Sequence, residues 1–147
     1  MLHVLEKCGY TADILPDTLI ESVIFAEKPG DGSAREQAAS CQRVLGAGAN
    51  ICREFATKRY RSNCVNWGML PFTIDDNTPF DYEAGDWILV CGIRDAVKGG
   101  SDKVQALVVH GDEVSKIDLY LRNFSRDERD IVLSGCLMNN YAEKQGE

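Results

Sequence analysis

The stretch Gly30-Asp31-Gly32-Ser33-Ala34-Arg35-Glu36-Gln37-Ala38-Ala39 follows the apolar run Val23-Ile24-Phe25-Ala26 and precedes a segment with helical periodicity. This order predicts a strand, a glycine turn and the start of a helix. Backbone N–H groups in the first turn of a helix have no partner within the helix, and they attract anions. An arginine at this place can bind a carboxylate through parallel hydrogen bonds, and Ser33 adds a hydroxyl beside it. The local sequence therefore predicts a small-anion site with a reactive oxygen.

The same residues also allow a purely structural interpretation. Ser33 and Glu36 have the spacing of a capping box, in which the serine accepts a hydrogen bond at the start of the helix and the glutamate reaches back to the serine. The stretch lacks both the Lys-Ser/Thr ending of a phosphate-binding P-loop and the third glycine of a dinucleotide-binding turn. From the local pattern alone, capping and anion binding both stay open.

The composition is that of one acidic globular domain. The chain has 147 residues, of which 44% are hydrophobic and 27% charged, and its formal net charge is −7. A chain of this length can bury a core in a single domain. Nucleic-acid binding is disfavoured, because phosphate neutralisation needs a basic patch. No apolar run approaches the roughly 20 residues that span a bilayer, and the apolar start at Leu2-His3-Val4-Leu5 is too short for a signal peptide. We therefore expect a cytoplasmic protein that binds neither nucleic acid nor membrane.

The cysteines give no metal-binding pattern. They are widely and irregularly spaced, without a Cys-x-x-Cys pair, at Cys8, Cys41, Cys52, Cys64, Cys91 and Cys136. Zinc sites and local iron–sulfur motifs need closer spacing. We expect no metal site in this chain, and six free, mostly buried thiols. Cys41 and Cys52 in particular are expected to be buried residues and not nucleophiles, since neither has an obvious neighbouring base.

Hydrophobic periodicity predicts an α/β domain. The expected strands lie at residues 20–26, 50–52, 87–91, 104–110 and 114–121, and the expected helices at 34–45, 57–67, 125–133 and 136–142. Ser125-Arg126-Asp127-Glu128 is a second capping-box candidate. Residues 69–72 are apolar, but Pro71 is expected to keep them out of a central strand, because proline cannot donate to the ladder. We divide the chain into a lead-in (1–19), the domain (20–142) and a polar tail (143–147).

Two blocks of the chain resemble the aconitase and isopropylmalate isomerase superfamily. Residues 30–39 resemble the family's Gly-x-Gly-Ser-Ser-Arg-Glu-x-Ala motif. Arg61-Ser62-Asn63 and Gly68-Met69-Leu70-Pro71 resemble its Arg-Ser-Asn…Gly-(aliphatic)-Leu-Pro block. The likeness covers about residues 20–142, and two motifs in the right order and at the right distance make it fairly specific. It implies a swivelling β/β/α domain, which is the C-terminal domain of aconitases and the small subunit of isopropylmalate isomerases.

The resemblance also implies a function. Members of this family dehydrate and rehydrate di- and tricarboxylic hydroxy acids with a 4Fe-4S cluster, whose ligands lie in other domains and include a Cys-x-x-Cys pair. The cluster is therefore expected on domains of the same chain or on a large subunit, and not on this chain. The expected function is that of the swivel domain of an aconitase-like hydro-lyase, with a small carboxylic acid as substrate.

The first family motif assigns roles to four positions. Ser33 matches the serine that, as an alkoxide, removes a proton from the substrate carbon. A hydroxyl can do this only where helix-start amides and a cation stabilise the anion. Arg35 matches the arginine that binds a substrate carboxylate, and Gly32 matches the glycine that lets the backbone approach. Ala34 departs from the family's second substrate-binding serine, and this loss removes a hydrogen-bond donor worth about 1 kcal/mol or more.

The second family block adds Arg61 and Asn63 as candidate substrate-binding residues facing the cleft. The alternative is that Arg61 belongs to a solvated helix face and that Asn63 orders a turn. Two functions stay open for the whole chain. Ser33 and Arg35 together favour the catalytic swivel domain. Ala34 favours a non-catalytic carboxylate-binding module that kept the fold and needs no cluster partner.

Overall fold

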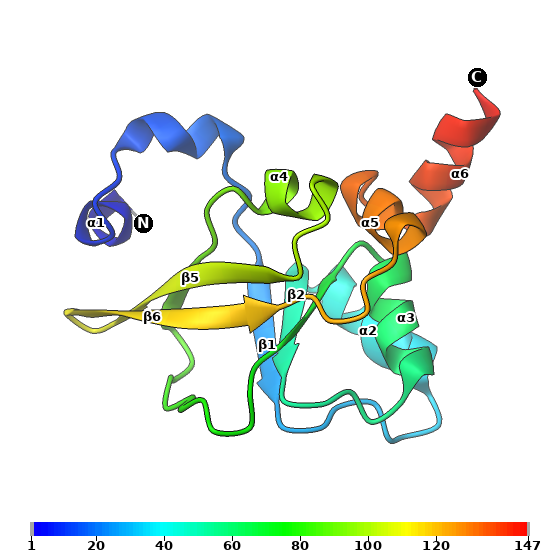
Figure 1. Ribbon diagram of the computed structural model, residues 1–147, viewed down its shortest axis with the longest axis horizontal. Helices are drawn as coiled ribbons and strands as arrows, with labels where there is room; N and C mark the ends of the chain where they lie inside the picture. Colours follow the sequence, from blue (N-terminus) through cyan, green and yellow to red (C-terminus); the bar gives the residue numbers. More distant parts are fainter. Residues whose placement is uncertain (1, 147) are drawn as a thin grey trace.

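The computed structural model describes residues 2–146 (Figure 1). In chain order its elements are α1 (Leu2–Lys7), η1 (Ala12–Asp17), β1 (Ser22–Ala26), α2 (Arg35–Val44), β2 (Ala47–Cys52), α3 (Lys58–Asn66), β3 (Leu70–Thr73), β4 (Trp87–Leu89), α4 (Ile93–Lys98), β5 (Lys103–His110), β6 (Glu113–Tyr120), α5 (Arg126–Leu133) and α6 (Leu137–Gln145). None of the described helices is long and apolar enough to cross a membrane.

The six strands form one mixed sheet with two distinct halves. The strand order is β1-β2-β3-β6-β5-β4. β1, β2 and β3 pair in parallel, with α2 and α3 as their crossover helices, whereas β6, β5 and β4 pair antiparallel. The two halves are joined through the pair Thr73–Tyr120, and Figure 1 shows β5 and β6 running across the direction of β1 and β2.

The main hydrophobic core lies between these two halves of the sheet. It includes Ile51 and Phe72 from the parallel half and Val108, Ile117 and Leu119 from the antiparallel half. A second cluster packs the helices α2 and α3 against the other face of the parallel half, through Ala39, Ala47, Tyr60, Cys64 and Met69. The order of layers is thus antiparallel strands, parallel strands, helices. This confirms the α/β fold class and fits the swivelling β/β/α domain that the resemblance implies.

The expectation that Pro71 keeps its segment out of a central strand is wrong. β3 includes Pro71 and lies between β2 and β6. The Ile74 amide donates to the Cys52 carbonyl of β2 at 2.9 Å. Because backbone groups alternate along a strand, those of Pro71 point the other way, toward β6. β6 pairs with β3 only at Thr73, so no ladder amide is required at position 71.

Two smaller expectations also need correction. α6 runs through Gln145, so the helix continues into the predicted polar tail; Met1 of the lead-in and Glu147 of the tail lie outside the described residues. All six cysteines are free, but only Cys52 and Cys64 are buried. Cys41 is exposed because it lies two positions from Ala39, the buried residue of α2, and so on the other side of the helix.

A buried polar cluster around Tyr60 links the crossover helices to the sheet. Tyr60 is 2% exposed, and its hydroxyl accepts a hydrogen bond from Gln42 Nε2 at 2.9 Å. The same hydroxyl donates to Asn50 Oδ1 at 3.4 Å, and Asn50 Nδ2 donates to Gln42 Oε1 at 3.0 Å. Burial raises the pKa of Tyr60 to about 12. The phenol therefore stays protonated. It donates to Asn50 of β2 and accepts from Gln42 of α2, so it links these two elements.

The turn that follows β1 packs directly on this cluster. Gly30 has a φ of +93°, and a Cβ at this position would lie 2.4 Å from Tyr60 Cβ. Thr57 Oγ1 donates to the Gly30 carbonyl at 3.1 Å, and the Ala56 amide donates to the Pro29 carbonyl at 2.9 Å. The start of α3 thus fixes the path of the chain toward Ser33.

This packing predicts opposite outcomes for the two glycines of the turn. Gly30→Ala is expected to lower the free energy of unfolding by about 2–4 kcal/mol, because it combines a left-handed backbone with a steric clash. Gly32→Ala is the matched control, since no heavy atom of the described residues, its two chain neighbours apart, lies within 4 Å of the Cβ it would add. We expect it to change stability by less than about 0.5 kcal/mol. Urea denaturation measures both. Equal effects of the two substitutions would contradict the assigned packing.

Arg129 of α5 is a buried cation that joins three segments of the chain. It is 7% exposed. Its guanidinium donates to the carbonyls of Phe124 (3.0 Å) and Ser101 (2.9 Å) and to Asp102 Oδ1 (2.8 Å). The loop before α5 and the loop before β5 are therefore held by one side chain.

Removing Arg129 leaves these carbonyls without their donor. Arg129→Leu is expected to lower the free energy of unfolding by about 2–3 kcal/mol. Arg126→Leu, on the exposed first turn of the same helix, is expected to change it by less than about 0.5 kcal/mol. Thermal or urea unfolding of both variants tests the difference, and a neutral Arg129→Leu would show that the buried network is dispensable.

Candidate functional site

Ser33 and Arg35 lie where the turn after β1 enters α2. The crossover connections of parallel strands start helices at the carboxyl edge of the sheet, and this is the edge at which open α/β sheets bind ligands. The Ser33 side chain is exposed, and Arg35, the first residue of α2, is half-buried. The structure therefore places the hydroxyl and the guanidinium of the first family motif at one helix start.

The capping-box interpretation of Ser33 and Glu36 is wrong. The N-cap of α2 is Ala34, and no side chain accepts a hydrogen bond at this cap. The Glu36 carboxylate accepts a hydrogen bond from Trp67 Nε1 of the neighbouring helix end at 3.0 Å and does not reach back to Ser33. The second candidate box, Ser125 with Glu128, does form at the start of α5. Ser33 thus keeps a hydroxyl that is not used as a cap, next to helix-start amides that no capping side chain satisfies.

Arg35 braces the turn from which it emerges. Its Nε donates to the Gly30 carbonyl at 3.2 Å, and its Nη2 lies 3.5 Å from the Asp31 carbonyl. Within residues 2–146 no carboxylate forms an ion pair with this guanidinium. An arginine has five N–H donors, so those not used by the turn are available to an incoming anion. The positive charge near Ser33 is thus preorganised without being neutralised.

The structure gives Arg61 a partner on another helix. Its Nη1 forms an ion pair with Glu128 Oε1 of α5, and its Nη2 donates to the Asn123 carbonyl at 3.1 Å. Partial burial raises the pKa of the Glu128 carboxyl, but hydrogen bonds from Arg61 and Ser125 outweigh it, and the net direction is downward. The carboxylate therefore stays charged, and Arg61 holds α3 against α5.

Asn63 is half-buried and lies two residues after Arg61, so the two side chains leave α3 in nearly opposite directions. Among the described residues, no hydrogen bond or ion pair joins Arg61 or Asn63 to Ser33 or Arg35. The structure thus brings together the residues of the first motif and shows no direct interaction between them and those of the second. The substrate-binding roles of Arg61 and Asn63 stay predictions.

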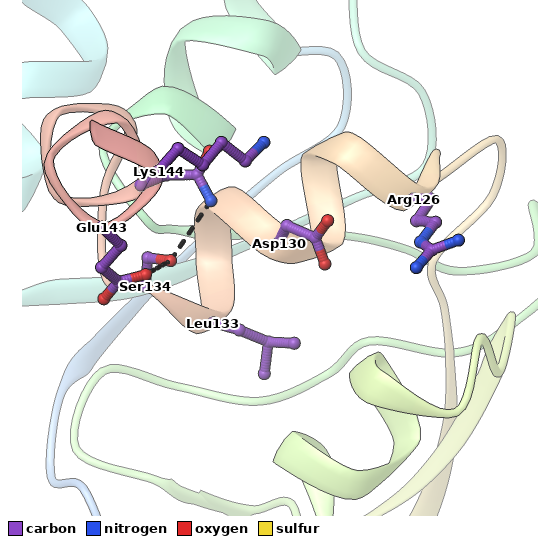
Figure 2. Close-up of a pocket in the computed structure, with 7 residues that line it drawn as sticks. Arg126, Asp130, Leu133, Ser134, Glu143 and Lys144 are labelled. Atoms are coloured by element: carbon purple, nitrogen blue, oxygen red, sulfur yellow. Dashed lines mark hydrogen bonds between the residues drawn. The ribbon is translucent and has the colours of Figure 1, made fainter. Parts of the chain in front are cut away.

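A cavity of about 530 Å³ between α5 and α6 is not this site (Figure 2). Its lining carries charges of both signs, from Arg126 and Lys144 and from Asp130 and Glu143. Ser134 at its base donates to Glu143 Oε2 at 2.6 Å and accepts from Asn140 Nδ2 at 3.3 Å. None of the motif residues lines it. We therefore identify the candidate site by the chemistry of Ser33 and Arg35, and not by the size of this cavity.

Ser33 and Arg35 make up the candidate site, and the Ser33 side chain is open to solvent. Among the described residues other than Gly32 and its two neighbours in the chain, no heavy atom lies within 4 Å of the position that a Cβ on Gly32 would take, so the backbone beside Ser33 is accessible from outside. Sequence reasoning missed the support that Tyr60 and Thr57 give to this turn. The partners of Tyr60, Gln42 and Asn50, lie 18 and 10 residues away on other elements, so no local pattern pointed to them.

Comparison with known proteins supports the resemblance. Residues 17–77 match the family described as the aconitase C-terminal domain. Aconitate hydratase A of Rickettsia bellii is 31% identical over 128 residues, which are 84% of this chain and 14% of the relative. Aconitate hydratase A of Bradyrhizobium diazoefficiens is 31% identical over 127 residues, 83% of this chain and 14% of the relative.

A mitochondrial aconitate hydratase of Gracilaria gracilis is 34% identical over 120 residues, 80% of this chain and 15% of the relative. The chain thus spans 14% to 15% of the length of these relatives, while the alignments cover most of the chain. Family match, alignments and layered α/β fold agree. The chain is therefore similar to the C-terminal domain of aconitases over most of its length.

Proposed function

We propose that this chain is the swivel domain of an aconitase-like hydro-lyase, and that it supplies a serine base and a carboxylate-binding arginine to a site completed by other domains. The observation that carries the proposal is the uncapped start of α2, where the free Ser33 hydroxyl lies beside Arg35. The aconitate hydratases among the relatives indicate the reaction class. The substrate is a di- or tricarboxylic hydroxy acid.

The proposed chemistry starts with binding. Arg35 and the first-turn amides of α2 hold one carboxylate of the substrate, and this fixes the substrate carbon next to Ser33 Oγ. Ser33 then acts as the base: its oxygen, as an alkoxide, takes a proton from that carbon. The helix-start dipole and the Arg35 charge stabilise the oxyanion, which would be very unfavourable in water. In the reverse direction the Ser33 hydroxyl returns the proton.

The 4Fe-4S cluster of the family does not fit the donor groups of this chain. Within residues 2–146, no three side chains from His, Cys, Asp and Glu gather closely enough to hold a metal ion. The cluster is therefore expected on other domains of a longer chain or on a large subunit. Such a partner would also close the candidate site and exclude water from Ser33. The cytoplasmic location stays a prediction from the sequence.

Ala34 supports a second candidate function, a carboxylate-binding module without catalysis. Ala34 is the N-cap residue of α2, where the family usually has a second, substrate-binding serine. A site that lacks this hydroxyl could keep the Arg35 contact and lose the precise orientation that proton abstraction requires. In this case the chain would need no cluster partner.

Kinetics of the assembled enzyme, the chain together with its cluster-bearing domains, tests the proposal. Ser33→Ala is expected to lower kcat by about 10²–10⁴ with little change in KM, as for loss of a general base. Arg35→Lys is expected to raise KM about tenfold, because a lysine cannot form parallel hydrogen bonds with a carboxylate. The matched controls are Ser40→Ala on α2 and Arg59→Lys on α3, which we expect to be neutral.

The two candidate functions give different results in this experiment. Unchanged kcat in Ser33→Ala would contradict the catalytic role of Ser33. Absence of turnover in the assembled wild-type enzyme, together with binding that depends on Arg35, would favour the binding module.

A further inference from the structure

A second cavity lies beneath the N-terminal segment and is separate from Ser33. Its volume is about 340 Å³, and its lining includes Cys8, Tyr10, Leu89, Cys91 and Lys116. Two thiols from distant parts of the sequence thus face one space. Cys8 directly follows α1, and Cys91 lies two residues after β4, which is one of the two edge strands of the sheet.

The backbone around Cys8 is fixed by the way α1 ends. The Tyr10 amide donates to the Leu5 carbonyl at 2.9 Å, the Gly9 amide donates to the Glu6 carbonyl at 3.0 Å, and Gly9 has a φ of +81°. These are the bonds of a Schellman motif. It turns the chain so that Cys8 and Tyr10 both line the cavity.

α1 is itself held on the sheet. Val4 and Leu5 are buried, and Lys7 Nζ donates to the Gly111 carbonyl at the tip of the β5–β6 hairpin at 2.9 Å. The segment that carries Cys8 is therefore a docked element of the fold.

Cys91 lies in the turn that follows β4 and lines the cavity together with Leu89 of that strand. Ile88 and Val90 pack in the main core. Side chains alternate along a strand, so Leu89 lies on the opposite, outer face, where it lines the cavity with Cys91. Leu89 pairs with Leu107, and Leu107 pairs with Lys116, so these residues form one surface beneath α1. Cys91 is exposed and can be reached by small molecules, whereas Cys8 is half-buried.

The ionisation of neighbouring groups agrees with this geometry. Burial and then the neighbouring Cys91 thiol raise the pKa of Cys8. A hydrogen bond with Cys91, followed by its charge, raises the pKa of Tyr10. The two cysteines are thus within reach of each other's charge, and Lys116 supplies a positive charge at the same cavity.

We propose that Cys8 and Cys91 form a reversible disulfide that fastens α1 to the outer face of the sheet when a small disulfide, such as oxidised glutathione, is present. The Cys91 thiolate attacks one sulfur of the small disulfide, and a mixed disulfide forms as one small thiol leaves. The Cys8 thiolate then attacks the Cys91 sulfur and releases the second small thiol. The protons of the two protein thiols end on the two small thiols, so atoms and electrons balance. The family match begins at residue 17, so Cys8 lies outside the matched region.

Thiol mapping tests this proposal on the full chain. The protein is incubated with oxidised glutathione, blocked with N-ethylmaleimide, digested and analysed by mass spectrometry. We expect a peptide that links Cys8 to Cys91, protection of two of the six thiols from the reagent, and full reversal by dithiothreitol. Hydrogen exchange of residues 2–10 should slow on oxidation, because the cross-link holds α1 in place.

Single substitutions make the test specific. Cys8→Ser should leave glutathione attached to Cys91 and abolish the slower exchange. Cys41→Ser removes the other exposed thiol and should leave the linkage unchanged. A stable glutathione adduct on Cys91 of the wild-type chain, with Cys8 still open to alkylation, would overturn the proposal. A linkage of Cys91 to Cys41 or Cys136, or no reaction at all, would overturn it as well.

Discussion

The contact between Gly30 and the ring of Tyr60 is the constraint on which the candidate site depends. Tyr60 is buried in α3, and its hydroxyl is shared between Gln42 of α2 and Asn50 of β2. Three elements therefore set the position of one ring, and the turn after β1 packs against it without a side chain of its own. Because α2 begins five residues after Gly30, this contact also fixes where the helix-start amides and Arg35 lie.

The candidate site makes physical sense as part of a larger assembly. The chain carries a formal net charge of −7, so an anionic substrate would be repelled by most of its surface. In the proposed function, Arg35 and the first-turn amides of α2 would attract the anion at this point of the surface. The site is nevertheless open, and an alkoxide in contact with bulk water would be protonated at once. A partner that covers the turn would solve this problem, as expected for a chain that spans 14% of its aconitate hydratase relatives.

Much of the fold could be predicted because local patterns and tertiary packing agree. The apolar run at 23–26 and the periodicity of α2 gave the first strand and helix, and the motif at 30–39 placed Ser33 and Arg35 at one helix start. The errors have a common cause in non-local contacts. Pro71 is tolerated in β3 because β6 pairs only at Thr73. Glu36 does not form the predicted capping box, because its carboxylate accepts a hydrogen bond from Trp67, which is 31 residues away in the sequence.

The pairing of Arg61 with Glu128 across 67 residues is equally invisible to a local pattern. The substrate-binding role that the resemblance implies for Arg61 stays a prediction, and the structure adds an ion pair through which Arg61 joins α3 to α5. The first motif thus predicted the start of α2, whereas the hydrogen-bond partner of Glu36 could not be predicted from it. Interactions that span distant segments decide which charged residue is free to meet a ligand.

The most direct test of this account is a titration of the ¹⁵N-labelled chain with a tricarboxylate, followed by NMR. The account predicts saturable shifts of the amide resonances of residues 30–36, lost in Arg35→Ala and retained in Arg59→Ala. No shifts in this segment, or shifts confined to the cavity between α5 and α6, would contradict the claim that the start of α2 is a preformed carboxylate site.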